Sequence, residues 1–591
     1  MRRALLSCGV FCLACGAAYG TAYNFTGAAN ANWTDSGSWS PSGVPDAPDT
    51  AAVKNGKNAV VTGTVTVGQL TIDNGSKIGN TGWGGSYNLV VTDASAASGD
   101  FTWTAQGGTP AHSGMSYNWD VAGHYRYLST ASINWNLPAS ARPKLVLRGT
   151  NKAYISKSFN PTRDFETVEI RGSYYDNGSA SDYSTSQTVV VKSGGQIVAR
   201  QTGADSTWVA RRFVFEGGQA NLPSPGTNVD FRYQCTNTDN GLANRKLVVA
   251  GGVTYPRDVV IGQNYWGAYD AATPYVYRVT GGDMTVSRDL IMYDPGQQSP
   301  GKFWLSTEDN NTGVSRNLIV HHNLTVSQGT AAPLSEFFGL KLNASTVVVD
   351  CDLIVGTAEM INSGTLDMGS ATIYLGGNFS FYRPNYFWST WAFSNWSSGT
   401  STLICTGNGT AITQTLRTQG DCGITLNNLI VRTPGTVQLY NGIGGKLLLT
   451  GNLVLDCGTF NDNDRAITFN GPNHTLFWDN NLCKVTGNSL DNIILLPDAV
   501  LYLDAGTHSI VKMDNIDMQT GSKLYLSGFT LTVEGTTFVS AEVSASGEPY
   551  TAWGSDGTLY GTLAVPEPAT LLLMGTGALG VLGYIRRRRM A

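Results

Sequence analysis

Residues 447–455 read LLLTGNLVL. This stretch has leucine at relative positions 0, 2, 6 and 8, namely Leu447, Leu449, Leu453 and Leu455. The same spacing recurs in MTVSRDLIM (284–292), LIVHHNLTV (318–326), VVVDCDLIV (347–355) and LVVAGGVTY (247–255). Apolar residues that alternate with a period of two face the same side of a strand. Each copy is therefore predicted to be two short strands joined by a three-residue corner that keeps the apolar side chains inside.

The last residue of every corner is one that tolerates a left-handed backbone: Gly252, Asp289, Asn323, Asp352 and Asn452. We expect a positive φ here, and we expect Asn452→Val to be destabilising for that reason. The copies begin 37, 34, 29 and 100 residues apart, which indicates stacked coils with a loose period in the low thirties. The sequence predicts an all-β chain folded as a right-handed parallel β-solenoid, with an array of Ig-like sandwiches as the alternative.

Composition supports a β-rich body. Charged residues make up 14% of the 591 residues, and glycine contributes 70, whereas soluble domains average about 25% charged residues. Without residues 1–20 and 566–591, the chain keeps 32 basic and 42 acidic residues, a net charge of −10. A mildly acidic body without a basic face makes nucleic acid an unsuitable partner.

The chain begins with the pattern of a secretory signal. Residues 1–20 place Arg2 and Arg3 before an apolar stretch that ends in Ala18-Tyr19-Gly20, and this predicts a signal peptide that forms a helix. Residues 21–60 are expected to cap the solenoid, because an open first coil invites pairing with other chains. This stretch resembles the N-terminal edge of secreted bacterial β-helix proteins through Trp33, Trp39, Pro45, Pro48 and Asp49.

The chain ends in three parts with separate physical roles. After a solenoid body over 61–545 and a linker over 546–565, Pro566 and Pro568 hold the backbone extended. Residues 569–585 form an uncharged run of 17 residues, long enough for a transmembrane helix. Arginines are expected to remain on the cytoplasmic side of the inner membrane, and four follow the run: Arg586, Arg587, Arg588 and Arg589. A plain membrane anchor is the simpler interpretation.

Pro566, Glu567, Pro568, the apolar run and the arginines together resemble the PEP-CTERM sorting signal of Gram-negative bacteria. A related tail is also described as the C-terminal segment of ice-binding proteins. The resemblance implies recognition by an exosortase-like enzyme, and membrane anchoring followed by delivery to the cell surface or outside. It also implies a link to exopolysaccharide or biofilm matrix. It covers residues 566–591 and implies nothing about the activity of the body.

The polar candidates for chemistry coincide with turns. His321 and His322 occupy one corner, so exposed turn residues explain them better than a metal site. Asp350 and Asp352 flank a cysteine in the next copy, where a glycosidase-type carboxylate pair or a calcium site is the alternative. The segment NDND (461–464) is interpreted as a plain turn, with a calcium site as the alternative. We expect no metal and no cofactor, and the six cysteines after the signal are interpreted as buried fillers or as disulfides.

The aromatic segment FSFYRPNYFWSTWAFSNW (379–396) interrupts the spacing and is predicted to be an insertion near 379–396. Flat rings on exposed loops suit stacking on sugars, so Trp388, Trp391 and Trp396 are the candidate carbohydrate-binding residues. A hydrophobic plug beneath a loop is the alternative. The sequence thus predicts a non-catalytic, exported surface or matrix protein whose partner is extracellular polysaccharide. A polysaccharide lyase or glycoside hydrolase and an ice-binding protein are the alternatives, although Thr62, Thr64 and Thr66 supply only one threonine row.

Overall fold

The structure is a computed structural model. It describes residues 20–28, 31–47, 49–72, 76–79, 88–91, 101–103, 118–122, 125–127, 144–150, 152–156, 167–176, 186–197, 206–216, 229–235, 246–263, 275–293, 303–309, 312–326, 338–356, 365–381, 396–418, 424–441, 446–479, 481–507, 510–533, 538–539 and 558–564. These residues form β-strands and the short 3₁₀ segments η1 (Ser36–Ser38), η5 (Gly407–Gly409) and η6 (Thr486–Asn488). A search of the described residues finds no helix with the length and apolar character needed to cross a membrane.

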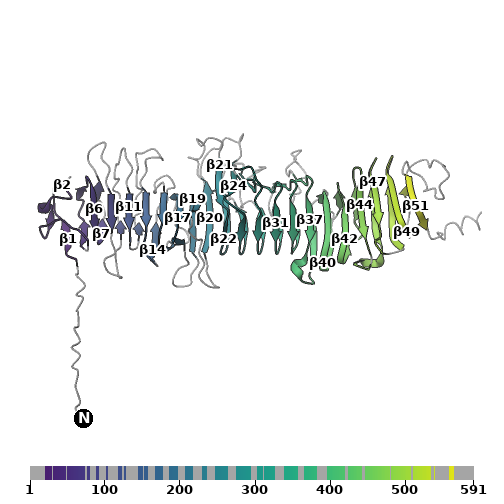
Figure 1. The fold of residues 1–591 in the computed structure, drawn as a ribbon, viewed down its shortest axis with the longest axis horizontal. Coiled ribbons are helices and arrows are strands. Elements are labelled where there is room, and N and C mark those ends of the chain that lie inside the picture. Colours follow the sequence, from purple (N-terminus) through teal and green to yellow (C-terminus); the bar gives the residue numbers. More distant parts are fainter. Residues whose placement is uncertain are drawn as a thin grey trace, which may run out of the picture. The chain divides into compact units, whose positions relative to one another are not determined.

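The chain divides into two units, and the N-terminal unit (Met1–Asp230) is built from parallel strands that stack coil upon coil (Figure 1). One sheet contains β3 (Trp39–Ser40), β1 (Ala22–Phe25), β4 (Thr50–Val53), β7 (Gln69–Ile72), β10 (Phe101–Trp103), β12 (Tyr125–Tyr127), β14 (Lys152–Ser156), β16 (Ser173–Asp176) and β18 (Gln196–Ile197). A second ladder contains β6 (Thr64–Val67), β9 (Asn88–Val91), β11 (Asn118–Val121), β13 (Lys144–Leu147), β15 (Thr167–Ile170), β17 (Ser186–Lys192) and β19 (Ser206–Glu216). A short third sheet contains β2 (Ala31–Asn32), β5 (Asn58–Val60) and β8 (Lys77–Gly79).

The beginning of this unit is closed by aromatic side chains. Strand β3 pairs with β1 in antiparallel orientation, whereas β4 pairs with β1 in parallel orientation. Trp33 and Trp39 are almost completely buried, and the Trp39 Nε1–H donates to the Trp33 carbonyl at 2.7 Å. Phe25 packs edge-on against Trp39. Asp49 accepts the N–H of Thr21 at 2.7 Å, which connects the residue before β1 to the residue before β4.

Glycines line one corner of the N-terminal unit, where adjacent coils approach each other closely. A Cβ atom at Gly172 would lie 1.9 Å from the carbonyl oxygen of Gly149, and one at Gly149 would lie 2.0 Å from that of Ala122. Gly195 meets the Ile170 carbonyl in the same way. Any side chain at these positions would push the coils apart, so we call Gly149, Gly172 and Gly195 the glycine ladder.

The C-terminal unit (Phe231–Ala591) has three strand positions per coil, and like positions pair in parallel from coil to coil (Figure 1). Position I is occupied by β22 (Val253–Tyr255), β25 (Met284–Val286), β28 (Leu318–Val320), β31 (Thr346–Val349), β34 (Thr372–Leu375), β37 (Thr402–Cys405), β44 (His474–Trp478), β47 (Val500–Asp504) and β51 (Thr558–Ala564). Position II is occupied by β20 (Val229–Cys235), β23 (Val259–Gln263), β26 (Leu290–Tyr293), β29 (Leu324–Val326), β32 (Leu353–Val355), β35 (Phe379–Phe381), β38 (Thr413–Thr418) and β45 (Cys483–Val485).

Position III completes each coil. It contains β21 (Lys246–Ala250), β24 (Tyr275–Thr280), β27 (Phe303–Ser306), β30 (Phe338–Lys341), β33 (Thr365–Asp367), β36 (Trp396–Ser397), β39 (Ile424–Leu426), β41 (Leu447–Leu449), β43 (Ala466–Phe469), β46 (Leu490–Leu495) and β50 (Phe538–Val539). Longer strands bend through a corner and serve two positions, namely β40 (Asn428–Leu439), β42 (Leu453–Asn461), β48 (Ile510–Met518) and β49 (Lys523–Val533). The body is therefore a parallel β-solenoid, as the sequence predicted.

The interior of the coils is filled by the apolar positions of the repeat. Met284, Leu318 and Val347 are register partners on successive coils, and all three are fully buried. Burial of an aliphatic side chain of this size contributes about 1.5–3 kcal/mol relative to exposure. Because the same column continues from coil to coil, this apolar stack is the main source of stability.

Two of the five sequence copies belong to a different corner from the other three. LVVAGGVTY and LLLTGNLVL each run from position III into position I, whereas the other copies run from I into II. Aligning all five was therefore wrong, although each is two strands around a three-residue corner. The register reveals two copies that were missed, VTYPRDVVI (253–261) and IYLGGNFSF (373–381). Coil starts in position I are 31, 34, 29 and 26 residues apart: Val253, Met284, Leu318, Val347 and Ile373.

The corner between positions I and II is held by side-chain oxygens. Asp289 Oδ1 accepts the N–H of Asn323 at 3.0 Å, and Asn323 Oδ1 accepts the N–H of Asp352 at 3.0 Å. Asp352 Oδ1 continues the series by accepting the N–H of Asn378 at 2.7 Å. We call this series the Asx ladder, since each Asp or Asn satisfies a backbone donor on the following coil.

The same device operates at the corner before position I. Asn428 Oδ1 accepts the N–H of Asn452 at 2.9 Å, and Asn452 Oδ1 accepts the N–H of Thr475 at 2.8 Å. The positive φ expected at the corner is found at Gly252, with φ +72°, and it is wrong for the other four predicted corners: Asp289, Asn323, Asp352 and Asn452. Asp and Asn act at these positions as hydrogen-bond acceptors and do not adopt a left-handed backbone.

The ordered coils extend into the predicted linker. Residues 558–564 form β51, which pairs with β49 from Lys523 onward. The rest of the segment 546–565 lies outside the described residues, as do residues 1–19 of the signal peptide and the helix 569–585.

Candidate functional site

The residues singled out for sorting and for sugar binding fall mostly outside the described part. This applies to Trp388, Trp391 and all seven sorting residues: Pro566, Glu567, Pro568, Arg586, Arg587, Arg588 and Arg589. Trp396 is placed by its backbone in β36, where its register partner is the buried Leu366. The repeat therefore includes Trp396, which the spacing alone had left outside it.

The aromatic insertion is shorter than predicted. Phe379 and Phe381 form β35 and are buried inside the coil at position II, in register with Leu353 and Val355. Their spacing follows the apolar column, because each Phe replaces an aliphatic residue of the preceding coil. Residues 382–395, between β35 and β36, are outside the described residues.

The two corner histidines are exposed and each contacts a carboxylate on a different neighbouring coil. His321 Nδ1 lies 2.8 Å from Asp350 Oδ2, and His322 Nδ1 lies 2.6 Å from Asp289 Oδ1. Both imidazoles are about half exposed, with 49% side-chain accessibility. As predicted, they are exposed turn residues. The contacts link three coils at the corner between positions I and II, beside the Asx ladder.

The carboxylates of Asp350 and Asp352 have separate partners. Asp350 meets His321, whereas Asp352 accepts both the backbone N–H and the side-chain amide of Asn378. Two carboxylates that are engaged in this way are parts of the corner structure. Turn structure thus explains them better than an acid–base pair does.

The segment NDND (461–464) forms a turn, with φ of +53° at Asn463 and +56° at Asp464. Asp462 is almost completely buried, and its Oδ2 accepts the N–H of Asp491 from the next coil at 2.8 Å. The Asp491 carboxylate in turn accepts the N–H of Asp464 at 2.9 Å. Burial, followed by the hydrogen bond between the two carboxyl groups, raises the pKa of Asp462 to about 8. The raised pKa favours the protonated form of Asp462 at neutral pH.

Other ligand and redox groups are dispersed. In the described part of the chain, no three His, Cys, Asp or Glu side chains come together in a way that could hold a metal ion. Four thiols are described and all are free: Cys351, Cys405, Cys457 and Cys483. Burial raises the pKa of Cys405 and of Cys483 to about 12, which makes both of them inert core residues.

A more promising surface lies on the outer face of position III, around Trp304 of β27. Its neighbour Leu305 is fully buried, so alternation places Trp304 on the outside, where it remains partly exposed. Its register partner on the following coil is Gly339. The ammonium Nζ of the exposed Lys341 lies 5.2 Å from the centroid of the Trp304 ring, within the range of a cation–π contact.

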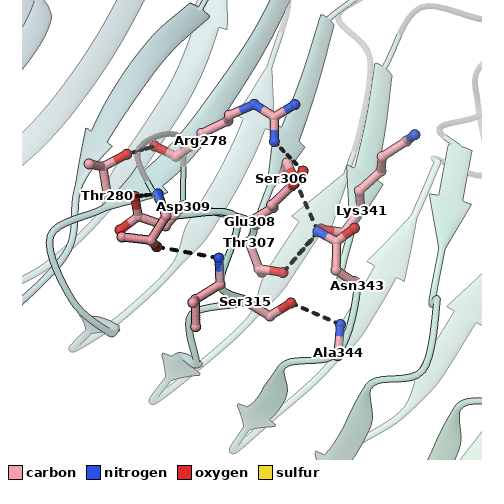
Figure 2. A network of polar contacts seen from close by, with 12 residues as sticks. Arg278, Thr280, Ser306, Thr307, Glu308, Asp309, Ser315, Lys341, Asn343 and Ala344 are labelled. Atoms are coloured by element: carbon pink, nitrogen blue, oxygen red, sulfur yellow. Dashed lines mark hydrogen bonds and ion pairs between the residues drawn. The ribbon is translucent and has the colours of Figure 1, made fainter.

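A polar network surrounds this surface, and Figure 2 shows how it spans adjacent coils. Arg278 of β24 forms an ion pair with Glu308, just beyond β27. Asn343, beyond β30, donates to Ser306 Oγ at 3.1 Å. Arg278, Ser306 and Lys341 are register partners on three successive coils. The network therefore fixes the row of polar side chains next to the indole.

A buried carboxylate anchors the turn that follows β27. Asp309 is buried and accepts two hydrogen bonds from Arg316, the shorter at 2.7 Å to Nη2. The same carboxylate accepts the N–H of Gly281 at 3.1 Å. The Thr307 hydroxyl, also buried, donates to the Leu342 carbonyl at 2.6 Å. These contacts hold Glu308 in place beside Arg278, so this edge of the surface is rigidly supported.

This surface could not be predicted from the spacing of residues along the sequence. A Trp in FWLS (303–306) and a Gly in FGLK (338–341) are unremarkable separately, and only the coil register brings them together. The loops between positions II and III differ in length from coil to coil, so this register could not be counted along the chain.

Comparison with protein families matches residues 564–589 to the PEP-CTERM protein-sorting motif. No curated protein and no solved structure matches the chain. The matched range contains the Pro-Glu-Pro and arginine residues on which the resemblance was based, so the recognition of the tail is confirmed. The motif indicates exosortase-dependent export of a surface protein with sorting through a C-terminal membrane anchor. It covers the tail alone, and the role of the body has to be argued from the body.

Proposed function

We propose that this chain is a surface or extracellular-matrix protein whose body is a non-catalytic solenoid scaffold delivered by its tail. The single observation that carries the proposal is the PEP-CTERM match over residues 564–589. Residues 1–20 act as the signal peptide, and residues 569–585 hold the chain in the inner membrane as a helix. Arg586, Arg587, Arg588 and Arg589 keep the C-terminus cytoplasmic until the exosortase-like enzyme processes the tail.

We propose the following division of the chain into domains. Residues 21–60 cap the solenoid, the coils follow from residue 61, and residues 566–591 form the sorting tail. We also propose right-handed winding, because crossovers between parallel strands are right-handed in nearly all proteins.

Extracellular polysaccharide is the proposed partner, which links the protein to exopolysaccharide or biofilm matrix. Trp388, Trp391 and Trp396 remain candidate stacking residues around β36. Support for a binding scaffold comes from the corners, where the Asp, Asn and His side chains connect neighbouring coils. A catalytic carboxylate has to contact the substrate, whereas these corner carboxylates are already bonded to neighbouring coils.

A polysaccharide lyase is the second candidate, because Arg278, Glu308 and Lys341 gather on adjacent coils. Lyase chemistry needs one group to neutralise the substrate carboxylate and another to remove the neighbouring proton. Arg278 is already paired with Glu308, which leaves Lys341 to serve both roles. The arrangement therefore favours binding over cleavage.

Ice binding requires a flat threonine array on successive coils. Thr66 has register partners of several kinds along its row: Val90, Asp120, Val146, Glu169 and Val190. The mixed character of this row gives ice binding no support.

The sorting proposal is tested by replacing Pro566, Glu567 and Pro568 with alanine and following the protein by cell fractionation. The parent chain is expected at the cell surface or in the medium, and the variant in the inner-membrane fraction with its tail uncleaved. An Ala569→Gly variant, outside the motif's fixed residues, serves as the control. Equal surface delivery of the triple variant and the parent would contradict the proposal.

A further inference from the structure

The indole of Trp304 lies flat on the neighbouring coil. A Cβ atom built at Gly339 would lie 2.3 Å from Cε3, and 2.5 Å from each of Cδ2 and Cζ3 of the indole. A point beyond the ring edge would be much farther from the two flanking atoms than from Cε3. The nearly equal distances therefore place Gly339 under the face of the ring. Only glycine leaves room for this arrangement.

One face of the ring is therefore covered by backbone, and the other face points away from the sheet. Lys341, two residues after Gly339 on the same strand face, holds its ammonium over this ring at 5.2 Å from the centroid. Lys341 is exposed, and within the described residues it has no carboxylate partner, in contrast to Arg278. The open face of the ring is thus next to a cation that forms no ion pair within the described residues, and a ligand that stacks on this face would displace the ammonium to the edge of the ring.

This combination defines a ligand class. A pyranose ring presents C–H groups on one face, which pack on an aromatic ring, and a uronic acid adds a carboxylate at its edge. We propose that Trp304, Gly339 and Lys341, here called the Trp304 platform, bind an acidic polysaccharide. A uronate ring stacks on the indole and its carboxylate pairs with Lys341. This inference rests on the proposed polysaccharide partner and gives that partner a chemical class and a site.

The surrounding network supports this assignment. Ser306, next to Trp304 on the outer face, is buried and held by Asn343, so the strand that carries the indole is fixed on both sides. The Arg278–Glu308 ion pair borders the platform on the preceding coil and is neutral as a pair. Lys341 is therefore the cation of this patch that a ligand carboxylate can reach, while its register partner Asp367 places a carboxylate on the following coil.

The test is affinity electrophoresis of the full-length protein in gels that contain polygalacturonate, with dextran as the neutral polysaccharide. Retardation by polygalacturonate is expected for the parent. Trp304→Ala should weaken it about tenfold, or ~1.4 kcal/mol. Lys341→Gln should weaken it by a smaller factor that disappears at high salt. Tyr502→Ala is the matched control, since Tyr502 is 44% exposed on position I of the same unit and its loss should leave retardation unchanged.

Thermal melting of each variant accompanies the gels. Trp304→Phe retains a flat ring and should retain most of the binding. If Trp304→Ala does not fold, the platform is tested by comparing Trp304→Phe and Lys341→Gln with the parent. If Trp304→Ala and Lys341→Gln are both retarded to the same extent as the parent, the Trp304 platform is not the binding site. The proposal of a polysaccharide partner would be unaffected by that result. Equal retardation of the parent by dextran would overturn the acidic class. The purified protein does not depend on sorting, so these results are independent of the fractionation experiment.

Discussion

The two units share one corner device, and the C-terminal unit adds a second. In both units glycines make room for the carbonyl of a neighbouring coil, and in the C-terminal unit a Cβ atom at Gly376 would lie 2.0 Å from the Asp350 carbonyl oxygen. In the N-terminal unit, Gly172 and Gly149 leave out the side chain so that one coil's carbonyl can approach the next. In the C-terminal unit, residues such as Asn323 and Asn452 use a side-chain oxygen to accept a backbone N–H of the following coil. A solenoid corner is therefore determined in one of two ways. Either glycine leaves room for the carbonyl of a neighbouring coil, or a side-chain oxygen accepts a backbone N–H of the next coil. The two kinds respond differently to mutation.

The comparison is tested most strongly at Gly172. Gly172→Ala places a Cβ 1.9 Å from the Gly149 carbonyl oxygen, so the coils must separate. The expected loss of stability is about 3 kcal/mol, at the upper end for overpacking, and it is measured by denaturant unfolding. Gly63→Ala is the matched control, because its Cβ would meet nothing within 4 Å. If both variants unfold like the parent, the glycine ladder is not a packing constraint.

The next prediction concerns the pH dependence of stability at Asp462, whose carboxyl group lies beside that of Asp491 on the following coil. Its pKa in the folded protein is about 8, above the ordinary value of 3.8, so the folded state binds more protons than the unfolded state between these values. Stability should therefore fall as pH rises from about 4 to about 8, and Asp462→Asn should remove this dependence. The variant is expected to be more stable than the parent by about 2 kcal/mol at neutral pH.

Melting curves across this pH range measure the difference. Asp504→Asn, at an exposed residue of β47 that takes no part in the pKa shift of Asp462, is the control and should leave the pH profile unchanged. A parent protein whose stability rises between pH 4 and pH 8 would contradict the raised pKa of Asp462.

The smallest expected loss of stability is at Asn452, and it distinguishes two explanations for Asp and Asn at the corners. They serve either as hydrogen-bond acceptors or as residues that tolerate a left-handed backbone. Asn452→Ala removes the acceptor for the Thr475 N–H and should cost about 1–2 kcal/mol. Asn452→Asp retains an acceptor and should be close to the parent, whereas Asn452→Gly should be no better than alanine. The opposite order, with glycine close to the parent and aspartate destabilised, would restore the left-handed corner that the sequence suggested. Chemical denaturation of the three variants settles the order.

The sequence predicted the solenoid because its interior is repetitive. Apolar residues at positions 0, 2, 6 and 8 describe any corner with three joining residues, which is why the copies at 247 and 447 looked equivalent to that at 347. The spacing contains no information on which corner is meant, and this depends on pairing between coils. Similarly, Asn and Asp suit both a left-handed backbone and an acceptor ladder, and composition cannot distinguish them.

The candidate surface was harder to predict than the fold. The tail was recognisable because its residues are contiguous and its order is fixed, and the family comparison confirms it. Trp304 and Gly339 are 35 residues apart and become neighbours only through coil register. Sites on a solenoid are assembled across coils, so linear motifs are poor guides to them.

The most direct test of the account is to incubate the purified full-length protein with a panel of neutral and acidic polysaccharides and to score retention and cleavage together. A scaffold that binds through the outer face of position III should retain acidic polysaccharides. It should generate no new reducing ends and no unsaturated uronate products, however long the incubation. Products that accumulate with time, and that disappear in Lys341→Gln, would contradict the non-catalytic scaffold and identify the protein as a polysaccharide-degrading enzyme.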